Sequence, residues 1–239
     1  MKFYSDLTRY YEYVFPLAPL KVKWLKGFVD VNHITSLLDV GCATGDLCEA
    51  MSHYVPKVHG FDLDPVMVQK AMTQYPECAH IFSEGNMLEM SLLFDGESYD
   101  LITCFGNTLV HISKVDLEKA LIQIKHKLNP GGWFIGQILN YDYVLDTPIK
   151  SLPLIDNEAI RFDRTYEWDN PTQLDFKTRL RVKDSGAIYD NVIQLYPIRR
   201  DVLEGLLKDT GFNRVTFYKD YNGNKAEGEH LPLIFTAKA

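Results

Sequence analysis

The sequence predicts an α/β fold with a mostly parallel sheet, helices on both of its faces and a small antiparallel insertion. Apolar strand-like runs and helical stripes alternate five times between residues 37 and 139, which requires parallel strands joined by helices. The first strand, 37–40, runs directly into a glycine-bearing turn and a helix. After residue 142 the apolar residues recur with the period of two that is typical of antiparallel strands.

Composition restricts the class of partner. The 239 residues are 46% hydrophobic and 24% charged, which suits one globular domain. The formal net charge is −7 and no basic stripe is present, which argues against nucleic acid. No apolar run is long enough to cross a bilayer, and the first residues lack a signal core, so we expect a cytoplasmic protein without a membrane partner. We expect a small-molecule substrate and either a monomer or a homo-oligomer.

Cysteine spacing argues against metal and disulfide chemistry. The four cysteines Cys42, Cys48, Cys78 and Cys104 show no paired C-x-x-C spacing, so neither a zinc site nor a disulfide framework is expected. We therefore expect four free thiols and no metal.

The glycine turn after the first strand is the candidate cofactor loop. Gly41 and Gly45 suit a turn in which a ligand approaches the backbone. A dinucleotide fingerprint counted from Gly41 requires glycine at Ala43 and Asp46, and neither position has it. Asp46 would also repel a pyrophosphate at the helix N-terminus. S-adenosylmethionine carries no phosphate, so the spacing favours it over a dinucleotide.

Two later strand ends offer further cofactor ligands. Asp62 closes the second strand 21 positions after Gly41 (62 − 41), where a carboxylate can accept hydrogen bonds from both ribose hydroxyls. The alternative role, a helix cap, is already filled by Asp64 before Pro65. Asn86 follows the third strand and can pair with an adenine edge, although loop asparagines also serve turn geometry alone.

The fourth strand, Tyr99 to Phe105, ends where the acceptor should bind. Asn107 and His111 follow it and come within reach of the cofactor's reactive half. His111 can equally be a structural histidine.

The two segments outside the alternating core are expected to cover the site. Residues 1–36 form a helical lid, with a first helix carrying Phe3 to Val14 that ends before Pro16, and residues 143–197 form the antiparallel insertion over the active site. The core then comprises 37–142 and 198–239. Arg164 is in register with two aromatic residues of the insertion, so it either binds an anion on their face or lies on a solvated face.

These motifs together resemble the class I S-adenosylmethionine-dependent methyltransferases over almost the full chain. The resemblance rests on the segments 38–45, 60–65, 85–87, 99–102 and 128–132, with Ala43 departing from the usual glycine. It implies a Rossmann-like, seven-stranded, mostly parallel sheet, and methyl transfer from S-adenosylmethionine, which leaves as S-adenosylhomocysteine.

A closer likeness is to glycine and sarcosine N-methyltransferases, carried by 21–25, 104–108, His111 and 140–142. The resemblance implies cofactor contacts from Trp24, Asp62, Asn86, Met87 and Phe105. Further cofactor contacts are expected from Asp39, Gly41, Ala43, Gly45, Leu63 and Met67. The resemblance also implies substrate contacts from Asn107, Asn140 and Tyr141. In those enzymes an arginine that holds the substrate carboxylate precedes the Asn-Tyr-Asp run, and this chain has Leu139 there. Arg164 is the candidate to replace it.

Methyl transfer is an in-line displacement in which alignment matters most. An amine acceptor needs no catalytic base, whereas a hydroxyl acceptor needs one, for which His111 and Tyr11 are candidates. We expect an amine rather than a hydroxyl acceptor. The alternatives are a non-catalytic S-adenosylmethionine-binding module and, with less support from the spacing, a dinucleotide oxidoreductase.

Overall fold

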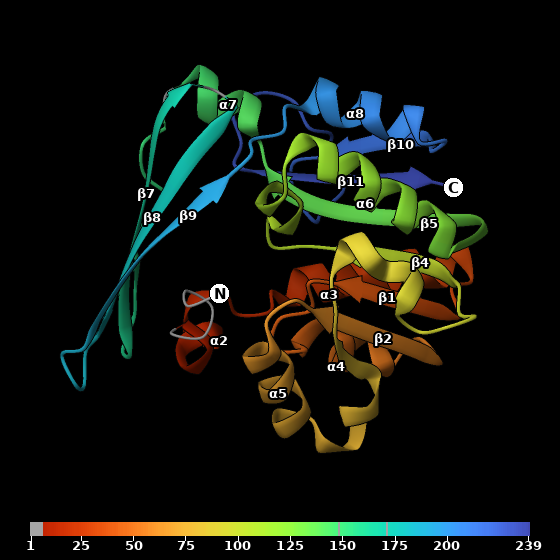
Figure 1. Cartoon of the computed structure of the whole chain (residues 1–239), viewed down its shortest axis with the longest axis horizontal. Helices are drawn as coiled ribbons and strands as arrows, with labels where there is room; N and C mark the ends of the chain where they lie inside the picture. Colours follow the sequence, from red (N-terminus) through yellow and green to blue (C-terminus); the bar gives the residue numbers. More distant parts are fainter. Residues whose placement is uncertain (1–6, 148, 171) are drawn as a thin grey trace.

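The computed structural model describes residues 7–147, 149–170 and 172–239, and these form a seven-stranded and a four-stranded sheet (Figure 1). The larger sheet has the strand order β10-β11-β5-β4-β1-β2-β3. Its strands are β1 (Ser36–Val40), β2 (Lys57–Asp62), β3 (Phe82–Glu84), β4 (Tyr99–Cys104), β5 (Leu128–Leu139), β10 (Asn213–Tyr218) and β11 (Pro232–Lys238). The helices around it are α3 (Pro19–Asn32), α4 (Asp46–Ser52), α5 (Pro65–Gln74), α6 (Lys114–Lys127) and α8 (Arg200–Asp209).

The pairing of these strands confirms the predicted mostly parallel sheet. β1 pairs in parallel with β2 and β4, and β3 and β5 extend the sheet in parallel on either side. β11 is antiparallel to both β5 and β10, so the chain closes with an antiparallel hairpin of β10 and β11. The carboxyl ends of β1, β2, β4 and β5 therefore lie at one edge of the sheet.

Helices cover both faces because the central strand is apolar on both sides. Leu37 packs with α3, α4 and α5, whereas its neighbour Leu38 packs with α6 and α8 on the opposite face. Every residue of β1 is buried. A continuous apolar run of this kind is typical of a parallel strand covered on both sides.

The four-stranded sheet stands to one side of the larger sheet and is antiparallel throughout (Figure 1). It follows the short helix α7 (Tyr141–Asp146) and has the order β6-β7-β8-β9. Its strands are β6 (Ile155–Asp156), β7 (Ile160–Asn170), β8 (Gln173–Val182) and β9 (Ile188–Leu195). This confirms the antiparallel insertion predicted over 143–197, between the fifth strand of the core and the last helix.

The N-terminal segment packs on the inner face of the small sheet. Leu7 and Val14 share a buried cluster with Ile160, Phe162 and Leu180. The predicted single helix is instead a 3-10 turn, η1 (Thr8–Tyr10), followed by α2 (Tyr11–Val14), because the backbone of Tyr10 leaves helical dihedrals. Phe3, which the helix prediction included, lies outside the described residues.

The strand bounds follow from their neighbours. The first strand, predicted over 37–40, begins one residue earlier at Ser36, and the fourth, predicted to reach Phe105, ends at Cys104. β3 begins only at Phe82, because 76–81 form a 3-10 helix, η2 (Pro76–Ile81). β5 begins as early as Leu128, because Leu128 already pairs with Tyr99 before a register shift.

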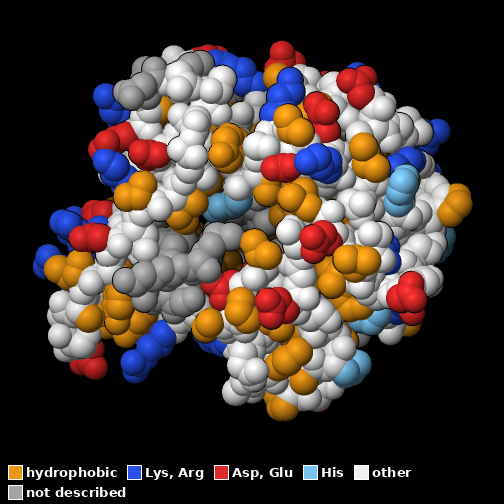
Figure 2. Space-filling model, in the orientation of Figure 1, with side chains coloured by type: hydrophobic (Ala, Val, Ile, Leu, Met, Phe, Trp, Pro, Cys, Tyr) orange, Lys and Arg blue, Asp and Glu red, His pale blue; other side chains and the backbone are white. Residues whose placement is uncertain are grey.

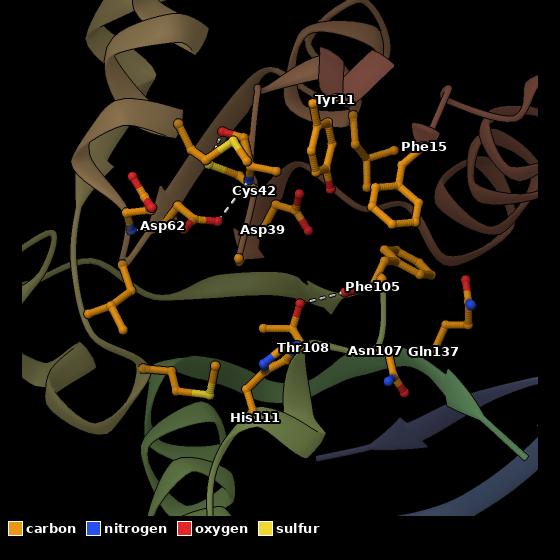
Figure 3. Close-up of a pocket in the computed structure, with 18 of the residues that line it drawn as sticks. Tyr11, Phe15, Asp39, Cys42, Asp62, Phe105, Asn107, Thr108, His111 and Gln137 are labelled. Atoms are coloured by element: carbon orange, nitrogen blue, oxygen red, sulfur yellow. Dashed lines mark hydrogen bonds between the residues drawn. The ribbon is translucent and has the colours of Figure 1, made fainter. Parts of the chain in front are cut away.

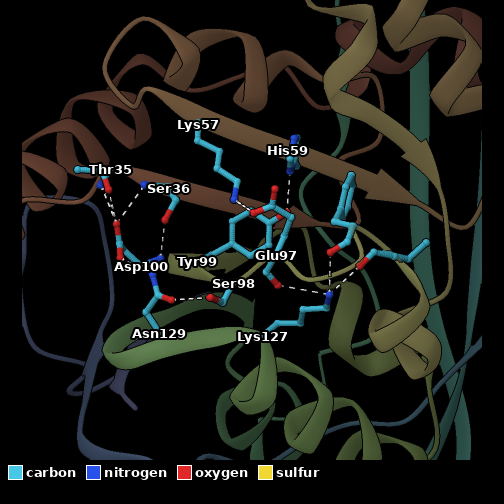
Figure 4. A network of polar contacts seen from close by, with 12 residues as sticks. Thr35, Ser36, Lys57, His59, Glu97, Ser98, Tyr99, Asp100, Lys127 and Asn129 are labelled. Carbon is cyan, nitrogen blue, oxygen red and sulfur yellow. Dashed lines mark hydrogen bonds and ion pairs between the residues drawn. The ribbon is translucent and has the colours of Figure 1, made fainter.

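Polar contacts secure the amino-terminal edge of the sheet (Figure 4). Asp100 accepts hydrogen bonds from Asn129 Nδ2 (2.7 Å), Thr35 N (2.9 Å), Thr35 Oγ1 (2.8 Å) and Ser36 N (3.1 Å). Burial would raise the pKa of Asp100, but these donors outweigh it and lower the pKa to about 2. Nearby, the buried Lys127 Nζ donates to the carbonyl oxygens of the 93–97 loop. The fold is thus fixed at the edge opposite the predicted site.

On the surface, Lys, Arg, Asp and Glu side chains are interspersed over the face shown in Figure 2. In the part of the chain that the structure describes, every helix is too short or too polar to cross a bilayer.

Candidate functional site

A cavity of about 480 Å³ lies at the carboxyl-terminal edge of the large sheet (Figure 3). Its walls come from the strand ends of that sheet, from the N-terminal segment and from the inner face of the small sheet. Thirteen of the seventeen residues that the sequence predicts for the site line it. These are Tyr11, Asp39, Gly41, Ala43, Asp62, Leu63, Met67, Asn86, Met87, Phe105, Asn107, His111 and Arg164.

The loop after β1 forms one wall of the cavity and depends on left-handed backbone. Gly41 has φ +75°, and a Cβ there would come within 2.8 Å of Thr108. Ala43 also has positive φ, +47°, which costs a non-glycine residue on the order of 1 kcal/mol. This conformation directs the Ala43 backbone N–H to Asp62 Oδ2 at 2.9 Å. The strained loop is therefore anchored to the end of β2.

Asp62 faces the cavity from the end of β2 (Figure 3). Its other oxygen, Oδ1, accepts from Asp64 N at 3.0 Å. Burial raises the pKa of Asp62, and the backbone donors Asp64 and Ala43 oppose that rise. Asp64 itself caps α5 by accepting from Val66 N at 2.9 Å. The residue that caps α5 is thus not Asp62, as the sequence indicates, although Asp64 also lines the cavity.

Asp39 and Lys21 place opposite charges in the same cavity. Asp39 is buried at the end of β1 and accepts from Thr103 Oγ1 at 2.6 Å. Burial raises the pKa of Asp39 to about 7, against the effects of Thr103 and Lys21. Lys21 Nζ, from α3, lies 4.9 Å from the ring centroid of Phe105 and 5.9 Å from that of Tyr221. Burial lowers the pKa of Lys21, and the charge of Asp39 opposes this.

Asp46 holds a negative charge at the first turn of α4 and also lines the cavity. Its carboxylate accepts from Tyr75 Oη at 2.7 Å and Thr44 Oγ1 at 2.5 Å. These two bonds fix the carboxylate where a pyrophosphate would approach the helix N-terminus.

His111 and Thr108 lie across the cavity from Asp39 and Asp62 (Figure 3). Burial lowers the pKa of His111 to about 4, so its imidazole is neutral at pH 7. Thr108 Oγ1 donates to the carbonyl oxygen of Phe105 at 2.7 Å, which fixes the turn before His111. Tyr11 enters from the N-terminal segment with its ring centroid 5.3 Å from that of Phe15.

Asn107, Tyr141 and Tyr166 form a hydrogen-bonded chain from β4 to the small sheet. Asn107 Oδ1 accepts from Leu139 N (3.0 Å), and its Nδ2 donates to Tyr141 Oη (2.9 Å). The buried Tyr141 hydroxyl is also hydrogen-bonded to that of Tyr166, which lines the cavity. The structure thus gives Asn107 two protein partners, and it puts Tyr141 behind the cavity wall.

Trp24, Gly45 and Asn140 also lie outside the cavity lining. Trp24 packs edge-on against Tyr218 and Tyr221, with ring centroids about 6 Å apart. At Gly45 a Cβ would come within 2.6 Å of the Phe82 ring, so this glycine serves helix packing. Asn140 starts α7 and contacts His230 Nε2 at 3.3 Å.

Sequence reasoning missed several residues of the cavity, above all Lys21 and Gln137. Lys21 precedes the buried Leu25 by four residues, so helical spacing alone puts it on the inner face of α3. Gln137 Oε1 accepts from Tyr221 Oη at 2.7 Å, a contact across 84 residues that no local pattern indicates.

Comparison with known proteins gives one family match and a group of relatives. Residues 37–132 match the family model described as a methyltransferase domain. A glycine/sarcosine/dimethylglycine N-methyltransferase of Actinopolyspora halophila is 27% identical, over 55% of this chain and 22% of that protein. A glycine/sarcosine N-methyltransferase of Aphanothece halophytica is 28% identical, over 59% and 52%. A ubiquinone biosynthesis O-methyltransferase of Leptothrix cholodnii is 28% identical, over 67% and 73%. The chain therefore spans about half or less of the length of the first two relatives.

Solved structures agree on the fold. An S-adenosylmethionine-dependent methyltransferase from Clostridium acetobutylicum superposes with a TM-score of 0.82 at 19% identity, covering 98% of both chains. The sugar N-methyltransferase KedS8 from a Streptoalloteichus species gives 0.71 at 16% identity, over 92% of this chain and 87% of that one. At these identities the likeness concerns the fold alone.

The raised pKa of Asp39 predicts a pH-dependent stability. The folded state binds a proton that the unfolded carboxyl, with a pKa near 3.8, releases. Protonated Asp39 therefore contributes its full share to the free energy of unfolding below about pH 4. This contribution is lost as the pH rises through about 7. We expect Asp39→Asn to stabilise the protein at pH 8 relative to the parent, by on the order of 2 kcal/mol, and by less at pH 5. Urea unfolding of the ligand-free protein at both pH values measures this.

Glu84→Gln is the control for this prediction, because Glu84 is exposed at the end of β3, which β2 separates from β1. We expect it to change stability equally at the two pH values. A difference between Asp39→Asn and parent that is the same at pH 5 and pH 8 would contradict the prediction.

Proposed function

Because residues 37–132 form a methyltransferase domain of the class I, S-adenosylmethionine-dependent type, we propose that the chain transfers a methyl group from S-adenosylmethionine to a small-molecule acceptor. The observation that carries this proposal is the charge pattern of the cavity. Asp62, Asp39 and Lys21 line it together. A nucleoside joined to a zwitterionic amino acid needs a hydroxyl-binding carboxylate, an anion for its ammonium and a cation for its carboxylate.

The residues present fit this cofactor. Asp62 keeps lone pairs for two ribose hydroxyls beyond those used by Ala43 N and Asp64 N. Lys21 and Asp39 suit the carboxylate and ammonium of the methionine end. Asn86 and Met87, which follow β3, suit the adenine. The bound cofactor supplies a methyl group on an electrophilic sulfonium.

The fixed Asp46 carboxylate at the α4 N-terminus disfavours the dinucleotide alternative, because it would repel a pyrophosphate. A binding module without catalysis differs from an enzyme only in turnover, so formation of S-adenosylhomocysteine separates the two.

An amine acceptor is favoured over a hydroxyl because of His111. A base whose conjugate acid has a pKa near 4 removes a hydroxyl proton poorly, whereas a neutral amine attacks with its own lone pair. The glycine/sarcosine N-methyltransferase relatives and the sugar N-methyltransferase KedS8 are named for methylation of nitrogen, which also supports an amine acceptor. The ubiquinone biosynthesis O-methyltransferase relative keeps the hydroxyl alternative open.

Residues 7–36, the described part of the lid expected over 1–36, and the insertion expected over 143–197 both cover the cavity in this proposal. Tyr11 and Phe15 from the first segment and Tyr166 and Phe176 from the second line the cavity. Their apolar surface excludes water while donor and acceptor are held in line.

The Tyr11 ring can also stabilise the sulfonium by a cation–π interaction. Tyr11→Leu should therefore slow turnover more than Tyr11→Phe, which keeps the ring.

Cofactor binding is the first test. We expect calorimetry to show S-adenosylhomocysteine binding that Asp62→Asn weakens by about 10–100-fold, since a charged hydrogen-bond acceptor is lost. Glu84→Gln, in register with Asp62 on β3, is the matched control and should bind as the parent does. A folded parent protein that binds neither S-adenosylmethionine nor S-adenosylhomocysteine would end the proposal.

The role of Lys21 is tested by removing part of the ligand. We expect Lys21→Met to weaken S-adenosylhomocysteine binding about tenfold, because the ligand's carboxylate loses its cation. Binding of 5′-methylthioadenosine, which lacks the amino-acid end, should stay within about threefold of the parent. Equal losses for both ligands would assign Lys21 a packing role instead.

His111→Asn distinguishes the two acceptor classes. With amine acceptors we expect the rate of S-adenosylhomocysteine formation to fall by less than about tenfold, because no base is required. With a hydroxyl acceptor the loss of a general base typically costs about 10²–10⁴-fold. A large loss on every amine that is turned over would show that His111 takes part in the chemistry.

A further inference from the structure

The cavity has two chemically different halves. Its four lining carboxylates, Asp39, Asp46, Asp62 and Asp64, all lie on or directly after β1 and β2. The half built by the small sheet and the segment before it has apolar walls and one charged residue. Its lining residues are Leu152, Arg164, Tyr166, Phe176 and Leu195.

Arg164 brings an uncompensated positive charge to this apolar half. Its Nη2 donates to the carbonyl oxygen of Pro153 at 2.6 Å. Its Nε is buried without a hydrogen-bond partner, and no carboxylate among the described residues lies within ion-pair distance. Burial lowers the pKa of Arg164, yet a guanidinium stays charged in a protein. A partly desolvated, unpaired charge is costly unless an anion joins it.

Two of the other three arginines of the same sheet pair with carboxylates, and the third, Arg181, is exposed on β8. Arg161 lies 3.3 Å from Asp163, and Arg179 donates to both carboxylate oxygens of Asp190 at 2.7 and 3.0 Å. Both of these side chains are exposed on the outward face. The arginine that turns into the cavity lacks the carboxylate that these two have.

The walls next to Arg164 suit a ring. Tyr166 and Phe176 lie with ring centroids 5.2 Å apart and an interplanar angle of 34°. The Tyr166 hydroxyl is held by Tyr141, so the face of its ring is fixed. Arg164 and Leu152 also line a second cavity, together with Pro153 and with residues of β7.

Resting on the proposed function, we propose that the methyl acceptor has an apolar, ring-bearing body and an anionic group, a carboxylate or a phosphoryl group, that binds Arg164. This differs from glycine and sarcosine, which have a carboxylate but no apolar body. The guanidinium supplies the paired donors that either anion accepts.

The experiment measures binding of matched probes to protein saturated with S-adenosylhomocysteine. The probes are 4-(aminomethyl)benzoate, 4-(aminomethyl)phenylphosphonate, 4-methylbenzylamine, which has the ring without the anion, and glycine, which has the anion without the ring. We expect one or both anionic ring probes to bind at least about tenfold more tightly than 4-methylbenzylamine and glycine. Which of the two binds more tightly identifies the anion as carboxylate or phosphoryl.

Variants assign the effect to Arg164. Arg164→Gln should bring the anionic ring probes to the affinity of 4-methylbenzylamine, and Arg164→Lys should keep part of the preference because it keeps the charge. Arg181→Gln, an exposed arginine on β8, should change nothing. Unchanged affinity for S-adenosylhomocysteine shows that each variant is folded.

The outcomes separate the two proposals. If S-adenosylhomocysteine binds but the anionic probes show no preference, or keep it in Arg164→Gln, the anionic acceptor is overturned and the methyltransferase proposal stands. If S-adenosylhomocysteine does not bind, the methyltransferase proposal fails. A thermal shift of the free protein with 4-(aminomethyl)benzoate, compared with Arg164→Gln, then still decides whether Arg164 binds an anion.

Discussion

The hydrogen bond from the Ala43 backbone to Asp62 sets the shape of the cavity. It ties the loop after β1 to the end of β2 at 2.9 Å, and it holds Ala43 at a positive φ that costs energy. The same bond, with that from Asp64 N, offsets the burial of the Asp62 carboxylate. Loop position and carboxylate charge therefore support each other. The loop supplies one of the two backbone hydrogen bonds to the buried Asp62 carboxylate, and Asp62 adds a third contact to the two that the Phe61 carbonyl oxygen makes with Gly41 N and Cys42 N.

Local patterns in the sequence predict the elements and the residues at strand ends, because a parallel sheet brings those ends to one edge. Asp62, Gly41 and His111 belong to this group. Gln137 was missed because its cavity position depends on Tyr221, which approaches only through tertiary packing. Helical spacing places Lys21 on the inner face of α3, but its meeting with Asp39 and Phe105 has no local signal. Trp24 was expected at the cofactor from the family resemblance, yet it lies outside the cavity lining and packs on Tyr218 and Tyr221.

The hydrogen-bonded chain Asn107–Tyr141–Tyr166 explains how two independent sheets make one cavity. Each member is fixed by the next, from the loop after β4 to the inner face of β7. An asparagine with positive φ, as at Asn107, suits the tight turn that begins the chain. The sequence shows an Asn and two Tyr residues but not their contact, because it spans about 60 residues of intervening chain.

The small sheet shares no strand with the large one. Exchanging its strands for others would therefore leave every backbone ladder of the large sheet intact, at the cost of repacking the side chains where Tyr166, Leu174 and Leu195 join the main core. Under the proposed function, the small sheet forms the wall that meets the methyl acceptor, and β1 and β2 form the wall that meets S-adenosylmethionine. Selection can accordingly alter the acceptor wall while the cofactor wall stays constant. Paralogues that diverge from this chain should differ most along β7 to β9 and least around β1 and β2.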